Sequence, residues 1–281
     1  MRKITSLLIL FGCFAFHATQ IYCKTTNVLQ VDSTKFNKLK AVLVVGHQED
    51  GTQEAVSKME GIATFLRSKK IKVICFYDTA AKWTNIVTAA KGAHFFIYSG
   101  HGTTLGENGN VGGFCVKSMV SSQKITEDLK LAKNAIVIFK SVCYGAGSSA
   151  GDNKDIGKAE AEKRVSEYAK PFFSVGATAY FANNMGGGVE DFLKAFFAGK
   201  SMHECYEASL GWGTKTELNK AYKYDATKNI VITSCHWEGK TTRTTYTNGV
   251  KKVEEVPSVK DYPIAYVANS LFTINEILTN L

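Results

Sequence analysis

The sequence predicts an α/β fold, a three-layer sandwich in which a mostly parallel sheet lies between two layers of helices and an antiparallel strand or hairpin follows at the C-terminal end. Short apolar segments rich in β-branched and aromatic residues alternate along the chain with segments of helical spacing. Strands that alternate with helices are typical of a parallel sheet covered on both faces. At 281 residues the chain is long enough to bury a substantial core.

The first three strands and two helices are expected before residue 102. Apolar runs predict strands at residues 41–45, 71–77 and 93–101. The first helix is indicated by apolar residues three and four apart, which share one face: Val56, Met59, Ala63 and Leu66. A shorter helix is expected over residues 83–90.

The middle of the chain predicts a short hairpin, a fourth buried strand and a loop. Residues 114–116 suit one hairpin arm, and residues 126–129 suit the first turn of a helix because acidic side chains are favourable at a helix N-terminus. The fourth strand ends at Cys143. Residues 145–157 consist mainly of Gly, Ser, Ala and Asp, so we expect a mobile surface loop that is cut during maturation. A helix should follow over residues 158–169 and end before Pro171.

The C-terminal third predicts further strands and helices of the same domain. Strands are expected at residues 172–181 and 229–233, with a helix at residues 189–198 between them. Ser201 suits the N-cap of another helix, with Glu204 completing a capping box. Residues 241–256 form strand-like arms around Asn248-Gly249, a strong hairpin signal. We expect this region to extend the same sheet.

Residues 1–23 have the pattern of an export signal, with Arg2-Lys3 followed by a short apolar core. A buried N-terminal strand or helix is the alternative. The signal implies a secreted or periplasmic, cell-envelope protein, and no later segment is apolar enough for a transmembrane segment. Five cysteines remain after the signal, so at least one thiol should be free. A disulfide among Cys115, Cys205 and Cys235 is left open.

The bulk charge and the metal-ligand inventory exclude two classes of function. The formal net charge is +9, but the lysines are spread along the chain without a basic cluster, so no nucleic acid partner is expected. His203 and Cys205 are two residues apart on a predicted helix and point to different faces. We therefore expect no metal site and no cofactor.

His101 and Cys143 each stand just past the end of an apolar strand. Ligands of open α/β sheets bind beyond the carboxyl ends of the strands, so both side chains should reach the same edge. A thiol and an imidazole there have the chemistry of a nucleophile and its base. Found together, they predict a cysteine hydrolase that attacks a carbonyl carbon. His101 alone would be an ordinary turn residue, and Cys143 alone an ordinary small core residue.

Tyr98-Ser99-Gly100-His101-Gly102 resembles the histidine motif of the caspase and metacaspase superfamily of cysteine peptidases, which includes the clostripain, gingipain and legumain types. Ser141-Val142-Cys143-Tyr144-Gly145 is similar to the cysteine motif of that superfamily. The two residues are 42 positions apart, near the roughly 50 of caspases. The resemblance covers about residues 40–210. It implies a catalytic domain over residues 36–240, with residues 241–281 as a hairpin extension of it.

The resemblance also implies roles for individual residues. Cys143 would be the nucleophile and His101 the general base and acid, and the backbone N–H groups of Gly102 and Cys143 would form the oxyanion hole. Ser141 stands where relatives often carry an acidic residue or Gln in the substrate pocket, so a preference for Arg or Lys does not carry over. His47 and Asp50 follow the first strand and are further candidates for substrate contact, with helix capping as the alternative for Asp50.

The implied activity is a secreted cysteine endopeptidase that acts on a polypeptide substrate, of open cleavage preference and unknown oligomeric state. Two alternatives remain. One is a binding or scaffold module of the caspase fold without peptidase activity. The other is a cysteine hydrolase of small amides.

Overall fold

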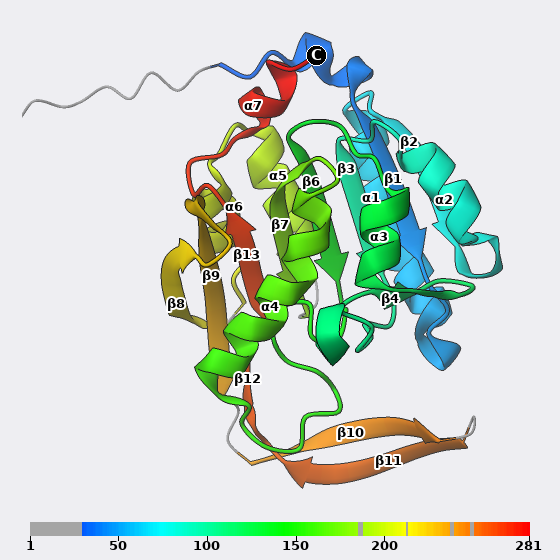
Figure 1. Cartoon of the computed structure of the whole chain (residues 1–281), viewed down its shortest axis with the longest axis vertical. Helices are drawn as coiled ribbons and strands as arrows, with labels where there is room; N and C mark the ends of the chain where they lie inside the picture. Colours follow the sequence, from blue (N-terminus) through cyan, green and yellow to red (C-terminus); the bar gives the residue numbers. More distant parts are fainter. Residues whose placement is uncertain (1–29, 185–187, 212, 237–238, 248–249) are drawn as a thin grey trace, which may run out of the picture.

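The computed structural model describes residues 30–184, 188–211, 213–236, 239–247 and 250–281. These residues form a three-layer α/β sandwich around a nine-stranded, mostly parallel sheet, which confirms the predicted fold class (Figure 1). The expected export signal, residues 1–23, lies outside the described residues. Each helix within the described ranges is too short or too polar to span a bilayer.

One half of the sheet is parallel and presents the carboxyl ends of its strands at one edge. The order is β7-β6-β3-β1-β2, with every neighbouring pair parallel. The strands are β1 (Lys40–Val45), β2 (Lys72–Tyr77), β3 (Phe95–Ser99), β6 (Ala135–Lys140) and β7 (Ala177–Asn183). The inner strands β1, β3 and β6 are nearly continuous apolar runs because both of their faces are buried.

The other half is antiparallel and comes from the C-terminal third, which extends the sheet as predicted. β13 (Ile264–Ala268) pairs with β7, and β9 (Asp225–His236) pairs with β13. The edge strands β8 (Lys215–Tyr222) and β12 (Lys260–Asp261) both pair with β9. The C-terminal β13 therefore lies inside the sheet, and the residues after 241 complete the main core.

Helices cover both faces of the sheet (Figure 1). One layer holds α2 (Trp83–Ala90), α3 (Ser122–Asp128) and α4 (Gly157–Phe173). The opposite layer holds α1 (Thr52–Ser68), α5 (Gly188–Phe197), α6 (Met202–Ala208) and α7 (Ile274–Leu278). Alternate residues of β1 enter the two cores, because successive side chains of a strand point to opposite faces.

Short elements connect these layers. The hairpin arm predicted at residues 114–116 is β4 (Phe114–Cys115), which pairs antiparallel with β5 (Met119–Val120). Four short 3₁₀ helices are also found in the described ranges: η1 (Ser33–Lys38), η2 (Glu49–Gly51), η3 (Asp78–Ala80) and η4 (Glu107–Gly109).

An aromatic cluster supports the carboxyl ends of β3 and β6. Phe139, next to the end of β6, is fully buried and lies at the centre of this cluster. Its ring centroid lies 5.4–5.9 Å from the rings of Tyr98, Phe114, Tyr168, Phe172 and Tyr180. Such pairs contribute about 0.5–1.5 kcal/mol each beyond their burial. The carboxyl ends of β3 and β6, which carry the candidate site, therefore pack against this buried aromatic cluster.

Two helix boundaries differ from the expectations. Residues 126–128 form the last turn of α3 rather than a first turn, because Ser121 caps the helix earlier by accepting a hydrogen bond from Lys124 N–H. α4 runs through Pro171 to Phe173 instead of ending before the proline. Phe172 is fully buried in the aromatic cluster, and β7 consequently starts at Ala177.

The predicted C-terminal hairpin is present, but it does not join the nine-stranded sheet. β10 (Lys240–Thr247) and β11 (Val250–Pro257) pair along their whole length as a separate two-stranded sheet. The expected turn at positions 248–249 lies outside the described residues. Figure 1 shows the hairpin running across the carboxyl edge of the parallel strands. Lys251 forms an ion pair of 3.0 Å with Asp50, which follows β1.

Candidate active site

His101 and Cys143 follow two strands that pair directly with each other. β3 and β6 are parallel neighbours, and their last residues, Ser99 and Lys140, lie opposite each other. His101 comes two residues after Ser99, and Cys143 three residues after Lys140. The loops that carry the two residues therefore leave the same edge of the sheet side by side.

The two loops are in direct backbone contact at Gly102. A Cβ atom at position 102 would lie only 2.1 Å from the carbonyl oxygen of Cys143 and 2.6 Å from the hydroxyl of Tyr168. No other residue type fits this position without moving one of the loops. The glycine after the histidine is thus required by the approach of the Cys143 peptide.

Two buried tyrosines fix the loop that carries His101. The Tyr168 hydroxyl accepts a hydrogen bond from Thr103 N–H at 2.8 Å and donates to the Thr103 carbonyl at 3.1 Å. The Tyr98 hydroxyl donates to the Cys115 carbonyl at 2.6 Å, and the His101 carbonyl lies 3.1 Å away. Burial holds the pKa of both phenols far above the usual value, so each remains a neutral donor.

Cys143 lies in a sharp turn bounded by two left-handed residues. Ser141 has φ +57° and Tyr144 has φ +67°, a conformation that is uncommon outside glycine. The turn is held by the bonds from Ser141 N–H to the Asn183 carbonyl (2.7 Å) and from Tyr144 N–H to the Ser148 carbonyl (2.8 Å). Backbone strain of this kind persists where the surroundings fix it, and it clusters at functional sites.

The two predicted oxyanion donors have free N–H groups. Neither Gly102 N–H nor Cys143 N–H donates a hydrogen bond to any other residue in the described ranges. Buried or half-buried N–H groups are nearly always paired in folded proteins. Two free donors on touching segments beside a thiol are therefore suited to bind an oxygen of a ligand.

Glu49, a residue that the sequence did not predict for the site, binds the imidazole of His101. Its Oε2 lies 2.9 Å from His101 Nε2, and both side chains are partly exposed. An ionised carboxylate only accepts, so Nε2 carries the proton in this pair and Nδ1 is the acceptor nitrogen of the neutral ring. Glu49 belongs to the loop after β1, beside the predicted Asp50, so only its place at the same sheet edge signalled it.

The other sequence candidates lie in different places. Ser141 lines the same pocket as Cys143. His47 is exposed and pairs with Asp78, just after β2, at 3.0 Å. Asp50 pairs with Lys251 of the hairpin. Of the three, only Ser141 lines the pocket that Cys143 lines, whereas His47 and Asp50 lie outside that lining.

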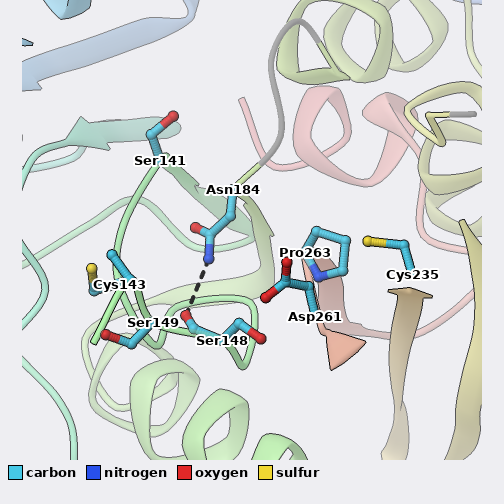
Figure 2. A pocket seen from close by; sticks show the side chains of 9 residues that line it. Ser141, Cys143, Ser148, Ser149, Asn184, Cys235, Asp261 and Pro263 are labelled. Atoms are coloured by element: carbon cyan, nitrogen blue, oxygen red, sulfur yellow. Dashed lines mark hydrogen bonds between the residues drawn. The ribbon is translucent and has the colours of Figure 1, made fainter. Parts of the chain in front are cut away.

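A pocket of about 310 Å³ opens beside Cys143 (Figure 2). Its walls come from the turn after β6, the end of β7, and strands β9 and β12. The lining residues are Ser141, Cys143, Ser148, Ser149, Ala150, Asn184, Cys235, Asp261 and Pro263. His101 is not among the residues that line this pocket.

The prediction of a surface loop after Cys143 is wrong for its first four residues. Residues 145–148 are buried, and only positions further along the loop are exposed. The Ser148 hydroxyl accepts from Tyr262 N–H at 2.8 Å. Arg164 binds Asp152 at 2.8 Å and the Gly147 carbonyl at 3.1 Å. Small residues occur here because the turn packs tightly. The expected maturation cut within the loop stays a prediction; the exposed positions of the loop are 150, 151 and 153–155.

The five cysteines of the described ranges form no disulfide with one another, so the disulfide left open among Cys115, Cys205 and Cys235 is not formed. Cys205 is fully buried, and burial raises the pKa of its thiol to about 12. Burial also raises the pKa of the Cys75 and Cys115 thiols. Thiols with a raised pKa are poor nucleophiles at neutral pH.

No model of a known protein family matches this sequence, and no curated protein is significantly similar to it. The function of the chain is therefore inferred from its own residues and their geometry.

Proposed function

We propose that the protein is a secreted or cell-envelope cysteine endopeptidase of the caspase-like superfamily, with Cys143 as nucleophile and His101 as general base and acid. The observation that carries the proposal is the contact between Gly102 and the Cys143 peptide. It joins the histidine loop to the cysteine turn, and it supports the assignment of His101, the thiol and the two free N–H groups to one reaction site. This is the set of groups that acyl transfer requires.

The first half of the reaction forms an acyl-enzyme. His101 takes the proton of the Cys143 thiol, and the sulfur attacks the carbonyl carbon of the scissile peptide bond. The carbonyl oxygen becomes an oxyanion that accepts from Gly102 N–H and Cys143 N–H. A donor of this type contributes about 3–4 kcal/mol to transition-state stabilisation. The intermediate then collapses to a thioester, and the leaving amine takes its proton from the His101 imidazolium.

The second half releases the product. Water attacks the thioester carbonyl while His101 accepts a proton from it, and the same two N–H groups bind the second oxyanion. Collapse of this intermediate expels the Cys143 sulfur and leaves a carboxylic acid. The sulfur takes back the proton from His101, which restores the starting state.

Glu49 serves as a positioning residue for His101. Its carboxylate at Nε2 holds the ring and stabilises the imidazolium that forms after proton transfer. The ring must turn its Nδ1 toward Cys143 when a substrate occupies the site. Hydrogen bonds of catalytic groups are often loose in the absence of ligand and tighten in the substrate complex.

The proposal is tested with a mixed peptide library and mass spectrometry of the products. The wild-type protein is expected to cut internal peptide bonds, and Cys143→Ala and His101→Ala should each lose cleavage by at least about a thousandfold. Cys75→Ala is the matched control, since Cys75 lies in β2 away from the site, and it should retain full cleavage.

The same experiment separates the two rivals. A binding module of this fold would leave every peptide intact while remaining folded by circular dichroism. A small-amide hydrolase would leave the library intact and release ammonia or an amine from simple amides in a Cys143-dependent manner. Either result overturns the peptidase proposal.

A further inference from the structure

The pocket beside Cys143 contains one charged side chain among its lining residues, Asp261. Asp261 lies at the end of β12 and pairs in register with Cys235 of β9. Figure 2 shows its carboxylate directed toward Asn184 and Ser148, in the interior of the pocket. The pocket therefore offers a negative charge close to the nucleophile.

No cation neutralises this carboxylate within the described part of the chain. No lysine or arginine nitrogen lies within 4.0 Å of Asp261 there, and the nearby cations are engaged elsewhere. Lys260 pairs with Glu217 at 2.9 Å, and Arg164 pairs with Asp152 at 2.8 Å. Burial raises the pKa of Asp261; a hydrogen bond to Ser148 opposes this rise, and the negative charge of Asp152 adds to it. A half-buried carboxylate without a counter-ion gains from a cationic ligand.

Asn184 adds a second acceptor to the same pocket. Its Nδ2 donates to the Ser148 carbonyl at 3.2 Å, which sets the orientation of the amide. Its Oδ1 is buried and has no hydrogen-bond partner among the described residues. Buried polar atoms without a partner are rare and point to a missing ligand or water. Ala150 and Pro263 complete the wall with apolar surface.

We propose that this pocket binds the side chain of a basic residue, arginine in preference to lysine, immediately before the bond that is cut, and that Asp261 is the residue that determines this specificity. The apolar wall suits the methylene stem, and Asp261 and Asn184 suit its charged end. A guanidinium presents five donors in a plane and can serve two acceptors on different elements, whereas an ammonium is a point charge. Acidic substrate side chains are repelled.

That the bound basic residue lies immediately before the cleaved bond rests on the proposed peptidase function. That the pocket binds a cationic side chain does not depend on that function. Two measurements keep them apart. The first is cleavage of matched peptides with arginine, lysine, citrulline or norleucine at the residue before the bond. Citrulline is the neutral counterpart of arginine, so this pair isolates the charge. The second is binding of Nα-acetyl-arginine amide and its citrulline analogue to the full-length Cys143→Ala protein.

We expect the arginine peptide to be cut at least tenfold faster than the citrulline peptide, measured as kcat/KM. Asp261→Asn should reduce this preference to less than threefold, mainly by lowering the rate for arginine. Asp155→Asn removes a charge from the neighbouring exposed loop and should leave the preference unchanged. Nα-acetyl-arginine amide should bind at least fivefold more tightly than its citrulline analogue, and Asp261→Asn in the Cys143→Ala protein should remove the difference.

The outcomes distinguish the two inferences. Equal cleavage and equal binding of the arginine and citrulline compounds by the unmodified pocket would overturn the cation pocket, whether or not peptides are cut. Arginine-selective binding without any cleavage would support the pocket and overturn the peptidase. The comparison of arginine with citrulline compounds can be made with Asp261 in place, so it still tests the proposal if Asp261→Asn fails to fold.

Discussion

At the residue scale, the candidate site depends on Gly102, because a side chain at this position would force the two loops apart. Gly102 touches the carbonyl of Cys143, and the N–H groups of both residues donate no hydrogen bond within the described ranges. His101 and Cys143 were predicted because each lies just past an apolar strand, and the role of Gly102 was implied by the resemblance of its motif. Neither Glu49 nor Asp261 belongs to a motif; only the place of Glu49 after β1 pointed to the site, and nothing local pointed to Asp261.

Gly102→Ala should abolish the alignment of the two loops. Its Cβ would lie 2.1 Å from the Cys143 carbonyl oxygen, so one loop must move. Because each oxyanion donor affects the rate by about 10²–10³, we expect kcat to fall by at least a hundredfold. The measurement is steady-state cleavage of the best library peptide.

The matched control is Gly61→Ala. Gly61 lies in α1 and has no atom within 4 Å of an added Cβ. This variant should keep full activity and gain about 0.5–1 kcal/mol of stability, because alanine is favoured over glycine in a helix. Unchanged kcat in Gly102→Ala would contradict the role given to the contact.

Glu49→Gln tests the positioning of the imidazole. The amide keeps the shape of the side chain but loses the charge that stabilises the imidazolium, so kcat should fall by about tenfold while KM changes less than twofold. Glu54→Gln, an exposed carboxylate in α1, serves as the control. A change in KM alone would assign Glu49 to substrate binding instead.

At the element scale, the capping box of α6 could be predicted because both of its partners carry the expected residue types. Ser201 and Glu204 form the predicted capping box of α6, with Glu204 accepting from Ser201 N–H at 2.8 Å. The boundaries of α3 and α4 were misread because Ser121 and the buried Phe172 act through capping and packing that local composition does not reveal. Local signals predict a helix well, and tertiary contacts determine its ends.

The capping box of α6 should make the free energy of unfolding decrease at acidic pH. Hydrogen bonds from the Ser201 backbone N–H and hydroxyl, with the neighbouring Lys200, lower the pKa of Glu204 from 4.5 to about 2. A carboxyl with a lowered folded-state pKa stabilises the fold above its unfolded pKa, and this contribution is lost as pH falls from about 4.5 toward 2. Because the side chain is half exposed, we expect about 0.5–1 kcal/mol.

Urea unfolding of wild type and Glu204→Gln measures this effect. The difference in free energy of unfolding should be present at pH 6 and shrink by pH 3, with Glu255→Gln, on the exposed hairpin, as the control. A difference that is the same at both pH values would show that the charge of Glu204 is not the cause.

At the scale of the whole molecule, the sheet collects a site from segments far apart in the chain. β6 contributes the thiol loop, β3 the histidine loop, and β12, more than a hundred residues later, the charge in the pocket. The alternation of strands and helices predicted the three-layer fold. The insertion of β13 between β7 and β9, which brings β12 to the pocket, follows from long-range pairing that sequence periodicity does not encode.

No disulfide is formed within the described ranges, and alkylation of the cysteine thiols can test this. Alkylation of the unfolded protein without reductant, followed by mass spectrometry, should modify Cys75, Cys115, Cys143, Cys205 and Cys235 completely. In the native protein Cys205 should stay unmodified because it is buried. A disulfide-linked peptide pair between any two of these residues would contradict the absence of disulfides among them.

The central claim, that Cys143 acts as a nucleophile assisted by His101, is tested most directly by covalent labelling with a peptidyl acyloxymethyl ketone and peptide mapping. We predict one adduct per chain, a thioether on Cys143, that is lost in Cys143→Ala, formed at least a hundredfold more slowly in His101→Ala, and unaffected in Cys75→Ala. An adduct on another cysteine, or labelling at an undiminished rate in His101→Ala, would contradict the account.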